Sequence, residues 1–277
     1  MQIPFGIKLR TCWDKNNSLV CIGLDPDIDK LPASVKNHAY PLFEFNKAII
    51  DATHELVCAY KPQIAYYAAY AAEDQLAMTI GHILEKYPTM PVILDAKRGD
   101  IGSTAEMYAR EAFDRYGADA LTVNPYMGGD TLEPYLSRTD KGVVILCKTS
   151  NKGSADIQDL KVDGREIYKI IAHKAATAWN ANKNVLLVIG ATYPEEMAQV
   201  RAIAPDIPFL VPGVGAQGGD VEKVIMNGKT ADGTGLIINS SRGIIYAGSG
   251  KDFADAAREI VQRTSEDPAI SSPGEKV

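Results

Sequence analysis

Histidine and cysteine, the residues that most often build metal and redox sites, are scarce in this sequence. There are four of each among 277 residues, and neither type occurs at the spacing of a common motif such as H-E-x-x-H or C-x-x-C. Cys21 and Cys147 lie inside apolar runs, which favours buried free thiols in a reducing compartment. We therefore expect no metal site.

An excess of positive charge and long hydrophobic runs are also missing. The formal net charge is −6 and the pI is about 5.3, whereas a surface for nucleic-acid backbones needs clustered Lys and Arg. No run approaches the roughly 18 to 20 apolar residues that cross a bilayer. We expect a cytoplasmic protein that binds neither nucleic acid nor membranes.

The sequence does contain a regular alternation of two kinds of segment. Short apolar runs bounded by turn residues alternate with segments of helical amphipathic spacing, which calls for a parallel sheet with helical crossovers. Eight such runs favour an α/β fold of the (β/α)8 TIM barrel type, whose typical length is about 250 residues. The runs cover residues 18–24, 56–67, 90–97, 118–125, 142–150, 184–191, 207–214 and 234–241.

A doubly wound open sheet is the alternative to the barrel. That fold usually places G-x-G-x-x-G after its first strand, but here the first run leads into Asp25, Pro26 and Asp27. Because no linker is evident, we expect a single barrel domain over residues 1–263 and a flexible tail over 264–277. The polar, irregular stretch 151–164 predicts a mobile loop.

Charged residues follow the third apolar run, at a barrel end where active sites lie. Asp95 and Lys97 are two residues apart, so both side chains point to one face while the strand persists, and Asp100 follows on the loop. A lone D-x-K can be a structural ion pair. Three charges leaving an apolar strand favour a functional site, because desolvated charges are costly. Carboxylates beside a lysine favour its charged form, which suits a proton donor better than a nucleophile.

A candidate phosphate site follows the seventh and eighth runs. Four glycines surround Gln217 in the segment 212–220, and glycine lets the backbone present N–H groups to an anion. Arg242 follows the eighth run, and its guanidinium suits bidentate phosphate binding. Phosphate sites in barrels most often lie after these two strands.

Together these residues resemble the orotidine 5'-phosphate decarboxylase family. The family signature D-x-K-x-x-D-I-x-x-T matches Asp95, Lys97, Asp100, Ile101 and Thr104, and the segment P-G-V-G-A-Q-G-G-D from residue 212 is similar to the family's phosphate loop. The resemblance covers nearly the whole barrel. It implies decarboxylation of orotidine 5'-phosphate to uridine 5'-phosphate in pyrimidine biosynthesis, without a cofactor, with Lys97 meeting and protonating the carbanion and Asp95 and Asp100 beside it.

The resemblance also implies roles for residues at the strand ends. It assigns the ribose to Asp25 and Lys61, the pyrimidine ring to Ser150 and Pro212, and the phosphate to Gln217 and Arg242. Thr149 stands beside Ser150, so the hydroxyl that contacts the ring is one of these two. In the family the second aspartate and the threonine reach into the partner's site, which implies a homodimer with Asp100 and Thr104 acting across the interface.

Two other functions remain open. A related barrel that acts on a sugar phosphate with bound Mg2+ would share the D-x-K-x-x-D array but needs additional carboxylates for the metal. A nucleotide-binding barrel without catalysis would act as a sensor, although a pure binder gains little from a buried charge cluster. Loss of activity with a chelator, or binding without turnover, separates these cases.

Overall fold

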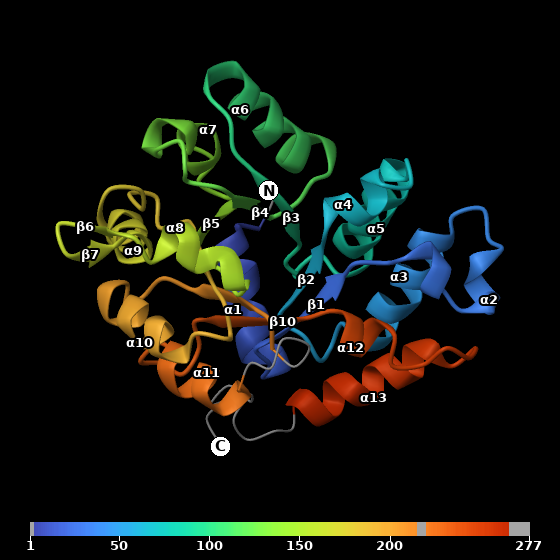
Figure 1. Ribbon diagram of the computed structural model, residues 1–277. Helices are drawn as coiled ribbons and strands as arrows, with labels where there is room; N and C mark the ends of the chain where they lie inside the picture. The colour runs from blue at the N-terminus through green and yellow to red at the C-terminus, as the bar shows by residue number, and fades with distance from the viewer. Residues whose placement is uncertain (1–2, 215–219, 266–277) are drawn as a thin grey trace.

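A sheet of eight parallel strands forms the centre of the molecule, in a computed structural model that describes residues 3–214 and 220–265 (Figure 1). The hydrogen-bonded order is β2-β1-β10-β9-β8-β5-β4-β3. Parallel pairing of Tyr60 with Val92 and of Gln63 with Asp95 joins the two ends of this order, so the sheet forms a nearly closed barrel. The strands are β1 (Val20–Leu24), β2 (Ala59–Pro62), β3 (Ile93–Arg98), β4 (Ala120–Val123), β5 (Gly142–Lys148), β8 (Val185–Ile189), β9 (Phe209–Pro212) and β10 (Leu236–Ser240).

Each of these strands falls on one of the eight predicted runs, and only β3 extends past its run, by one residue, so the predicted (β/α)8 barrel is confirmed. Every residue of β1, β4 and β8 is buried, as expected for parallel strands covered on both faces. The run 56–67 extends beyond its strand, however. β2 ends at Pro62, and Gln63 then caps a short helix by accepting a hydrogen bond from the backbone N–H of Ala65.

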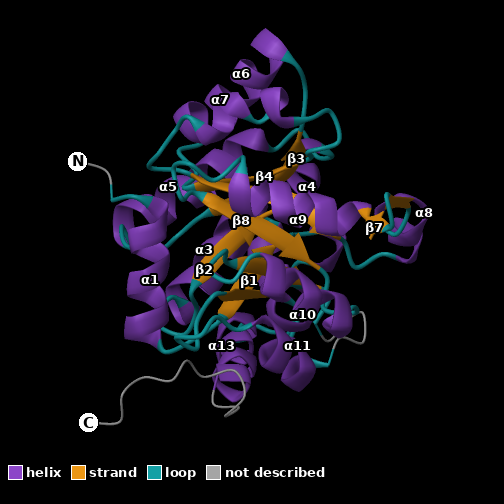
Figure 2. Ribbon diagram, turned by 90° about the vertical axis from the view of Figure 1, so that its left-hand side faces the viewer, coloured by secondary structure: helices purple, strands orange, loops and turns teal. Residues whose placement is uncertain are grey.

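Helices surround the strands on the outside, as Figure 2 shows with helices in purple and strands in orange. The predicted amphipathic segments correspond to α3, α5, α6, α9, α10 and α13. The helices are α1 (Phe5–Asn16), α2 (Ala33–Lys36), α3 (Pro41–Thr53), α4 (Ile64–Ala68), α5 (Glu73–Lys86), α6 (Gly102–Arg110), α7 (Glu133–Leu136), α8 (Ala155–Gln158), α9 (Ile167–Thr177), α10 (Pro194–Ile203), α11 (Val221–Gly228), α12 (Arg242–Ile245) and α13 (Phe253–Ser265).

Helix α1 packs against the amino ends of the strands, opposite the end where active sites lie. Trp13 Nε1 donates to the carbonyl of Leu236, the first residue of β10, over 3.0 Å. Lys8 pairs with Asp119, just before β4, at 2.8 Å, and both side chains are buried. These contacts leave the carboxyl ends of the strands for the site.

The stretch 151–164, predicted to be irregular, is folded. A 3-10 turn (Lys152–Ser154) leads into α8, and β6 (Lys161–Val162) pairs antiparallel with β7 (Arg165–Glu166). Asp163 and Gly164 form the turn, with φ of 51° and 76°. Asp-Gly suits a two-residue hairpin turn that needs positive φ at both positions. The stretch is therefore more regular than its sequence indicated, and its predicted mobility stays a prediction.

The predicted boundary between barrel domain and tail, at residue 263, lies inside the last described helix. Helix α13 continues to Ser265. Residues 266–277 lie outside the described part of the chain, so the tail stays a prediction.

Candidate active site

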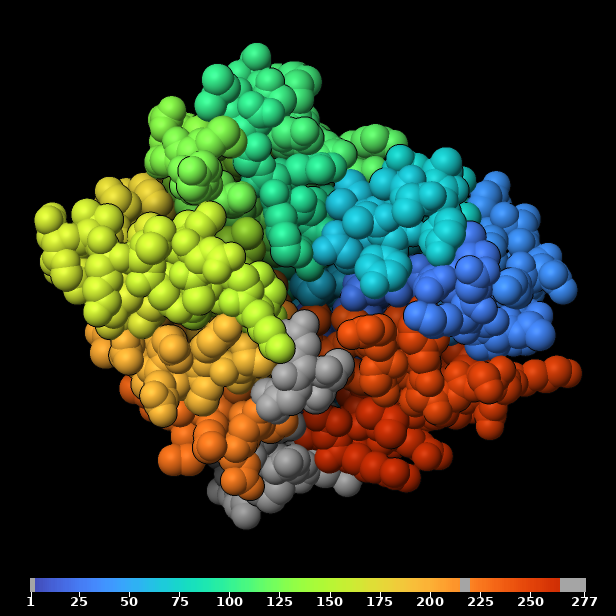
Figure 3. Space-filling view, in the orientation of Figure 1, coloured from blue at the N-terminus to red at the C-terminus, as the bar shows by residue number. Residues whose placement is uncertain are grey.

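A cavity of about 1050 Å³ opens at the carboxyl ends of the strands. In Figure 3 this face is hollowed near its centre, beside the yellow-green segment that contains α8. Strands β2, β3, β4 and β9 contribute lining residues, and the loop after β5 adds more. The lining includes Lys61, Asp95, Lys97, Thr122, Ser150 and Pro212.

Asp95 lies between two lysines in this cavity. Lys61 Nζ donates to Asp95 Oδ2 over 2.8 Å, and Lys97 Nζ donates to Asp95 Oδ1 over 2.7 Å. The side chain of Lys61 is 5% exposed and that of Lys97 is 49% exposed. Lys61 is therefore a buried anchor for the carboxylate, while Lys97 presents its ammonium to the open cavity. We call this arrangement of Lys61, Asp95 and Lys97 the charge ladder.

The charge ladder sets the ionisation of its buried members. Burial alone would raise the pKa of Asp95, but the ammonium groups of Lys61 and Lys97 hold it well below its ordinary value. Burial alone would lower the pKa of Lys61, but the carboxylates of Asp95 and Asp25 raise it well above its ordinary value. Asp95 is therefore ionised and Lys61 is charged at neutral pH.

Thr122 on β4 is a site residue that the sequence analysis missed. Its hydroxyl donates to Asp95 Oδ1 over 2.9 Å and accepts from the backbone N–H groups of Ala96 and Lys97, also over 2.9 Å. Lys97 needs this support because its φ is 48°, a left-handed conformation that is costly for a residue with a side chain. The only sequence signal for Thr122 was that a residue with a hydroxyl group occurs in the second half of the apolar run 118–125.

Arg98 fixes the strand end on the other side of Lys97. Its Nε and terminal nitrogen bind the two carboxylate oxygens of Glu111 at 2.9 and 3.0 Å. Glu111 begins a short π-helical segment (Glu111–Arg115) that follows α6. Forked arginine–carboxylate pairs are geometrically specific, so this contact holds β3 and α6 in a defined relation.

Asp25 lies next to the charge ladder, after β1. One of its carboxylate oxygens, Oδ1, is buried and has no hydrogen-bond partner within the described residues. A buried carboxylate oxygen without a partner is costly. Asp25 therefore has an unused acceptor beside the charge ladder, although it does not itself line the cavity.

Asp100 and Thr104 are not brought to the charge ladder of their own chain. Asp100 Oδ1 accepts from the backbone N–H of Ile101 over 2.8 Å, and among the described residues no ion pair joins Asp100 to Lys97. Thr104 lies exposed on α6. Neither residue lines the cavity.

The predicted phosphate side is described in part. Arg242 begins α12, is exposed, and forms no ion pair or hydrogen bond through its side chain to any described residue. Pro212 lines the cavity, and Gly213 follows with a φ of 95°, a conformation that favours glycine. Gln217 lies outside the described residues.

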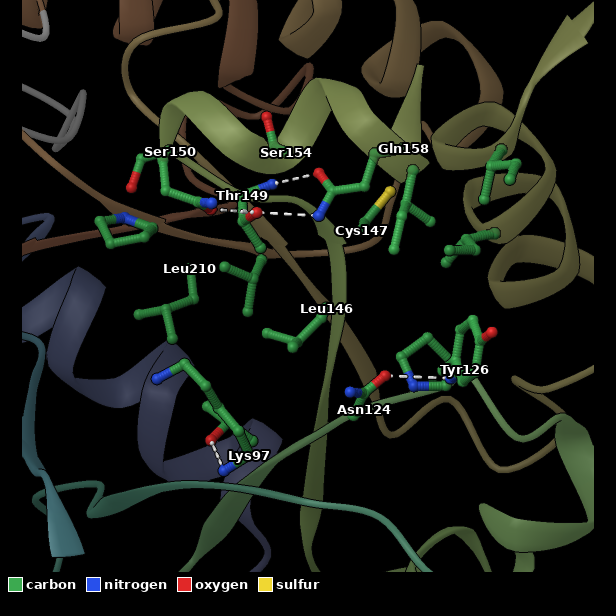
Figure 4. Close-up of a pocket in the computed structure, with 18 of the residues that line it drawn as sticks. Lys97, Asn124, Tyr126, Leu146, Cys147, Thr149, Ser150, Ser154, Gln158 and Leu210 are labelled. Atoms are coloured by element: carbon green, nitrogen blue, oxygen red, sulfur yellow. Dashed lines mark hydrogen bonds between the residues drawn. The ribbon is translucent and has the colours of Figure 1, made fainter. Parts of the chain in front are cut away.

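Thr149 and Ser150 differ in the state of their hydroxyl groups (Figure 4). Thr149 Oγ1 donates to Asn151 Oδ1 and accepts from Gln158 Nε2, each over 2.8 Å. Ser150 also lines the cavity, and its hydroxyl makes no hydrogen bond to any described residue. Ser150 therefore has the hydroxyl that is available to a ligand.

Other expectations concern metals, thiols and membranes. All four cysteines are buried and free, as predicted. Within residues 3–214 and 220–265, no three His, Cys, Asp or Glu side chains gather in a way that suits a metal ion. None of the helices in these ranges combines the length and apolarity of a membrane span.

The fold and the site together define a class of protein: a (β/α)8-barrel enzyme with a charged site at the carboxyl ends of its strands. Residues 18–260 match the model of the Orotidine 5'-phosphate decarboxylase / HUMPS family. The chain belongs to this family.

Known proteins similar to this chain include orotidine 5'-phosphate decarboxylases of bacteria. The protein from Cellvibrio japonicus is 60% identical over 260 residues, covering 93% of this chain and 95% of the relative. That from Ralstonia pickettii is 58% identical over 260 residues, covering 94% and 96%. The solved structure of Leishmania donovani OMP decarboxylase has a TM-score of 0.81 and 40% identity, covering 95% of this chain and 99% of that one.

Proposed function

We propose that this chain decarboxylates orotidine 5'-phosphate to uridine 5'-phosphate, a step of pyrimidine biosynthesis, and that Lys97 protonates the ring carbon left by CO2. The activity follows from membership of the family and from the high identity to relatives named for it. The observation that carries the role of Lys97 is the charge ladder, whose cavity-facing ammonium is held 2.7 Å from a buried, ionised aspartate.

The substrate is positioned by groups around the charge ladder. The ribose is assigned to Asp25, which has an unpartnered carboxylate oxygen, and to Lys61, which lines the cavity. Arg242, which is exposed and unpaired among described residues, supplies a guanidinium for the phosphate. Gln217 is assigned to the phosphate on the basis of the sequence motif alone.

The pyrimidine ring is assigned to Ser150 and Pro212, which both line the cavity. Thr149 was the alternative to Ser150. Because the hydroxyl of Thr149 already has a donor and an acceptor partner, while that of Ser150 has neither, the geometry favours Ser150.

The chemistry follows from the charges. Loss of CO2 leaves negative charge on a ring carbon that faces the Lys97 ammonium, and the ammonium then gives that carbon a proton. A carbanion roughly 3.3 Å from an ammonium gains about 5 kcal/mol at an effective dielectric constant near 20. Since about 1.4 kcal/mol corresponds to a tenfold change in rate, this interaction supplies between three and four decades of rate acceleration. The rest of the acceleration comes from the preorganised field and from phosphate binding remote from the reacting carbon.

A homodimer completes the site in this proposal. The partner subunit's Asp100 lies beside the substrate carboxylate and helps to fix Lys97, and Thr104 also acts across the interface. Two large apolar side chains next to these residues, Ile101 and Met107, are 62% and 52% exposed. Exposed apolar groups near polar residues are typical of an interaction surface, which supports a partner at α6. We place the homodimer in the cytoplasm, with residues 1–263 as the catalytic domain.

Incubation of purified protein with orotidine 5'-phosphate and a chelator tests the activity. The ultraviolet absorbance of the substrate falls as the ring loses its carboxylate, and the proposal expects a steady fall that the chelator does not slow. A fall that requires added Mg2+ would contradict a cofactor-free reaction. A flat trace from folded protein that binds uridine 5'-phosphate would indicate a sensor.

A further inference from the structure

Lys148, the last residue of β5, is a buried cation that the proposed chemistry does not use. Its side chain is 0% exposed. The ammonium donates to Asp159 Oδ1 over 2.6 Å and to Ser154 Oγ over 3.2 Å, and it lies 4.4 Å from the ring centre of Tyr193. A buried ammonium is stable only with such partners. Lys148 does not line the cavity, so it does not touch a substrate there.

The two hydrogen-bond partners of Lys148, Ser154 and Asp159, belong to the segment that follows Ser150, the residue proposed to contact the pyrimidine ring. Ser154 Oγ donates to the hydroxyl of Tyr193 over 3.3 Å, and this hydroxyl donates to the carbonyl of Asn151 over 3.4 Å. Asp159 follows α8 directly. The ammonium therefore holds both the beginning and the end of the segment 151–159 close to the end of β5.

Two further contacts complete the folded segment. The backbone N–H of Thr149 donates to Gln158 Oε1 over 2.9 Å, and Gln158 Nε2 donates back to Thr149 Oγ1 over 2.8 Å (Figure 4). This reciprocal pair joins the end of β5 to the end of α8. It leaves Ser150 between two residues whose side chains are already engaged, Thr149 and Asn151.

The end of β8 supports Ser150 from the other side. A Cβ atom at Gly190 would lie 2.6 Å from Ser150 Cα, so the backbones approach as closely as glycine permits. The Gly190 N–H donates to the carbonyl of Lys148 over 2.7 Å, and Thr192 Oγ1 donates to the carbonyl of Ser150 over 3.2 Å. The backbone of Ser150 is therefore held on both sides.

We propose that Lys148 is a positioning residue that holds the 149–159 segment so that the Ser150 hydroxyl faces the pyrimidine ring. This inference rests on the proposed function, because the ring contact of Ser150 is part of it. Lys148 acts through Ser150 rather than on the reacting atoms. Removing its charge therefore affects recognition of the base and leaves recognition of the sugar phosphate intact.

The test compares binding of uridine 5'-phosphate and of ribose 5-phosphate, which lacks the ring, by calorimetric titration and competition. Lys148→Met keeps the length and apolar stem of the side chain, and the released Asp159 is 40% exposed and can be hydrated. We expect Lys148→Met and Ser150→Ala each to weaken uridine 5'-phosphate binding by about tenfold, the loss of one hydrogen bond. Ribose 5-phosphate binding should change less than about twofold, and the double variant should bind no more weakly than Ser150→Ala.

Lys141→Met is the matched control. Lys141 immediately precedes the other end of β5, is also buried, and donates to the carbonyl of Ala118 over 3.1 Å. We expect its replacement to lower thermal stability without changing the ratio of the two affinities. If Lys148→Met does not fold, Asp159→Ala removes the carboxylate that joins the ammonium to the end of α8, and the same selective weakening of uridine 5'-phosphate binding is expected.

Four results would overturn the inference, and only the last of them also contradicts the ring contact of the proposed function. Equal weakening of both ligands in Lys148→Met would show a merely structural role. Additive losses in the double variant would show that Lys148 does not act through Ser150. Unchanged uridine 5'-phosphate binding in folded Lys148→Met, together with weakened binding in Ser150→Ala, would show that Lys148 has no positioning role. The ring contact of Ser150 would then still stand. If Ser150→Ala does not change uridine 5'-phosphate binding, Ser150 does not contact the ring, and the inference about Lys148 fails as well.

Discussion

At the scale of single residues, the charge ladder combines two lysines with different tasks. Lys61 is buried and keeps Asp95 ionised, while Lys97 faces the cavity and is free to approach a substrate. One carboxylate therefore balances a buried cation and the cation that, in the proposed mechanism, protonates the ring carbon. In this proposal both stability and chemistry depend on Asp95.

We expect Asp95→Asn to destabilise the protein by about 3 to 5 kcal/mol, because it removes the carboxylate that pairs directly with the buried Lys61. The measurement is urea unfolding followed by circular dichroism. Asp14→Asn is the control, since Asp14 forms an exposed pair with Arg10, and such pairs contribute about 0 to 1 kcal/mol. Equal, small losses in both variants would contradict a buried role for Asp95.

The directions in which the pKa values of Asp95 and Lys61 are shifted predict how the stability difference between wild type and Asp95→Asn depends on pH. The pKa of Asp95 is depressed, so its stabilisation is present above its ordinary pKa of 3.8 and is lost as the pH falls through the folded value. The pKa of Lys61 is raised, so its contribution is complete below its ordinary 10.5 and is lost only as the pH rises through the folded value. We expect the stability difference between wild type and Asp95→Asn to be constant from about pH 5 to pH 9 and to shrink in stronger acid. A difference that titrates near neutrality would contradict these assignments.

The sequence predicted Asp95 and Lys97 as neighbours because their spacing is local. Thr122 was missed because its importance depends on β4 lying beside β3, a long-range pairing. The left-handed conformation of Lys97 was also out of reach, since a lysine has no intrinsic preference for it.

At the scale of elements, the strands were predictable and several connections were not. Eight apolar runs with turn residues between them predict a barrel directly. Helix α1 was missed although Phe5, Leu9 and Trp13 are spaced at four-residue intervals, because the same buried face contains Lys8. Its buried partner Asp119 is known only from the structure.

Helix α1 yields a stability prediction. We expect Trp13→Ala to cost about 3 to 5 kcal/mol, because a large buried aromatic group leaves a cavity against the barrel and its hydrogen bond to the carbonyl of Leu236 is lost. The control is Ile7→Ala on the same helix, whose side chain is 58% exposed. Thermal unfolding measures both. A similar small effect of the two variants would contradict the packing of α1.

The 161–166 hairpin contains a turn signal that is present in the sequence, although no hairpin was predicted there. Asp163 and Gly164 form the Asp-Gly pair that favours a two-residue turn. The flanking strands are only two residues long, and three of their four residues are exposed, so they lack the apolar alternation by which strands are usually recognised.

At the scale of the whole molecule, the site proposed here needs two chains. Asp100 and Thr104 belong to the motif but do not line the cavity of their own chain. Nothing in the spacing of a single sequence reveals which chain a residue serves. The assignment of Asp100 and Thr104 to the partner's site therefore rests on the family resemblance and is a proposal.

Mixing two inactive variants tests the shared site. We expect Lys97→Ala and Asp100→Ala to be inactive alone, and their hybrid dimers to recover activity, because one of the two sites then contains an intact Lys97 and an intact partner Asp100. The measurement is turnover of orotidine 5'-phosphate after mixing and equilibration. No recovery in a sample shown to contain hybrid dimers would count against the shared site.

The most direct test of the account compares wild type and Lys97→Ala for turnover of orotidine 5'-phosphate and for binding of uridine 5'-phosphate. Asp95 keeps its hydrogen bonds from Lys61 and Thr122 in this variant, so the protein should fold and still bind the nucleotide. The account predicts that turnover is abolished while binding is largely retained. Turnover close to that of the wild type would contradict the central role of Lys97.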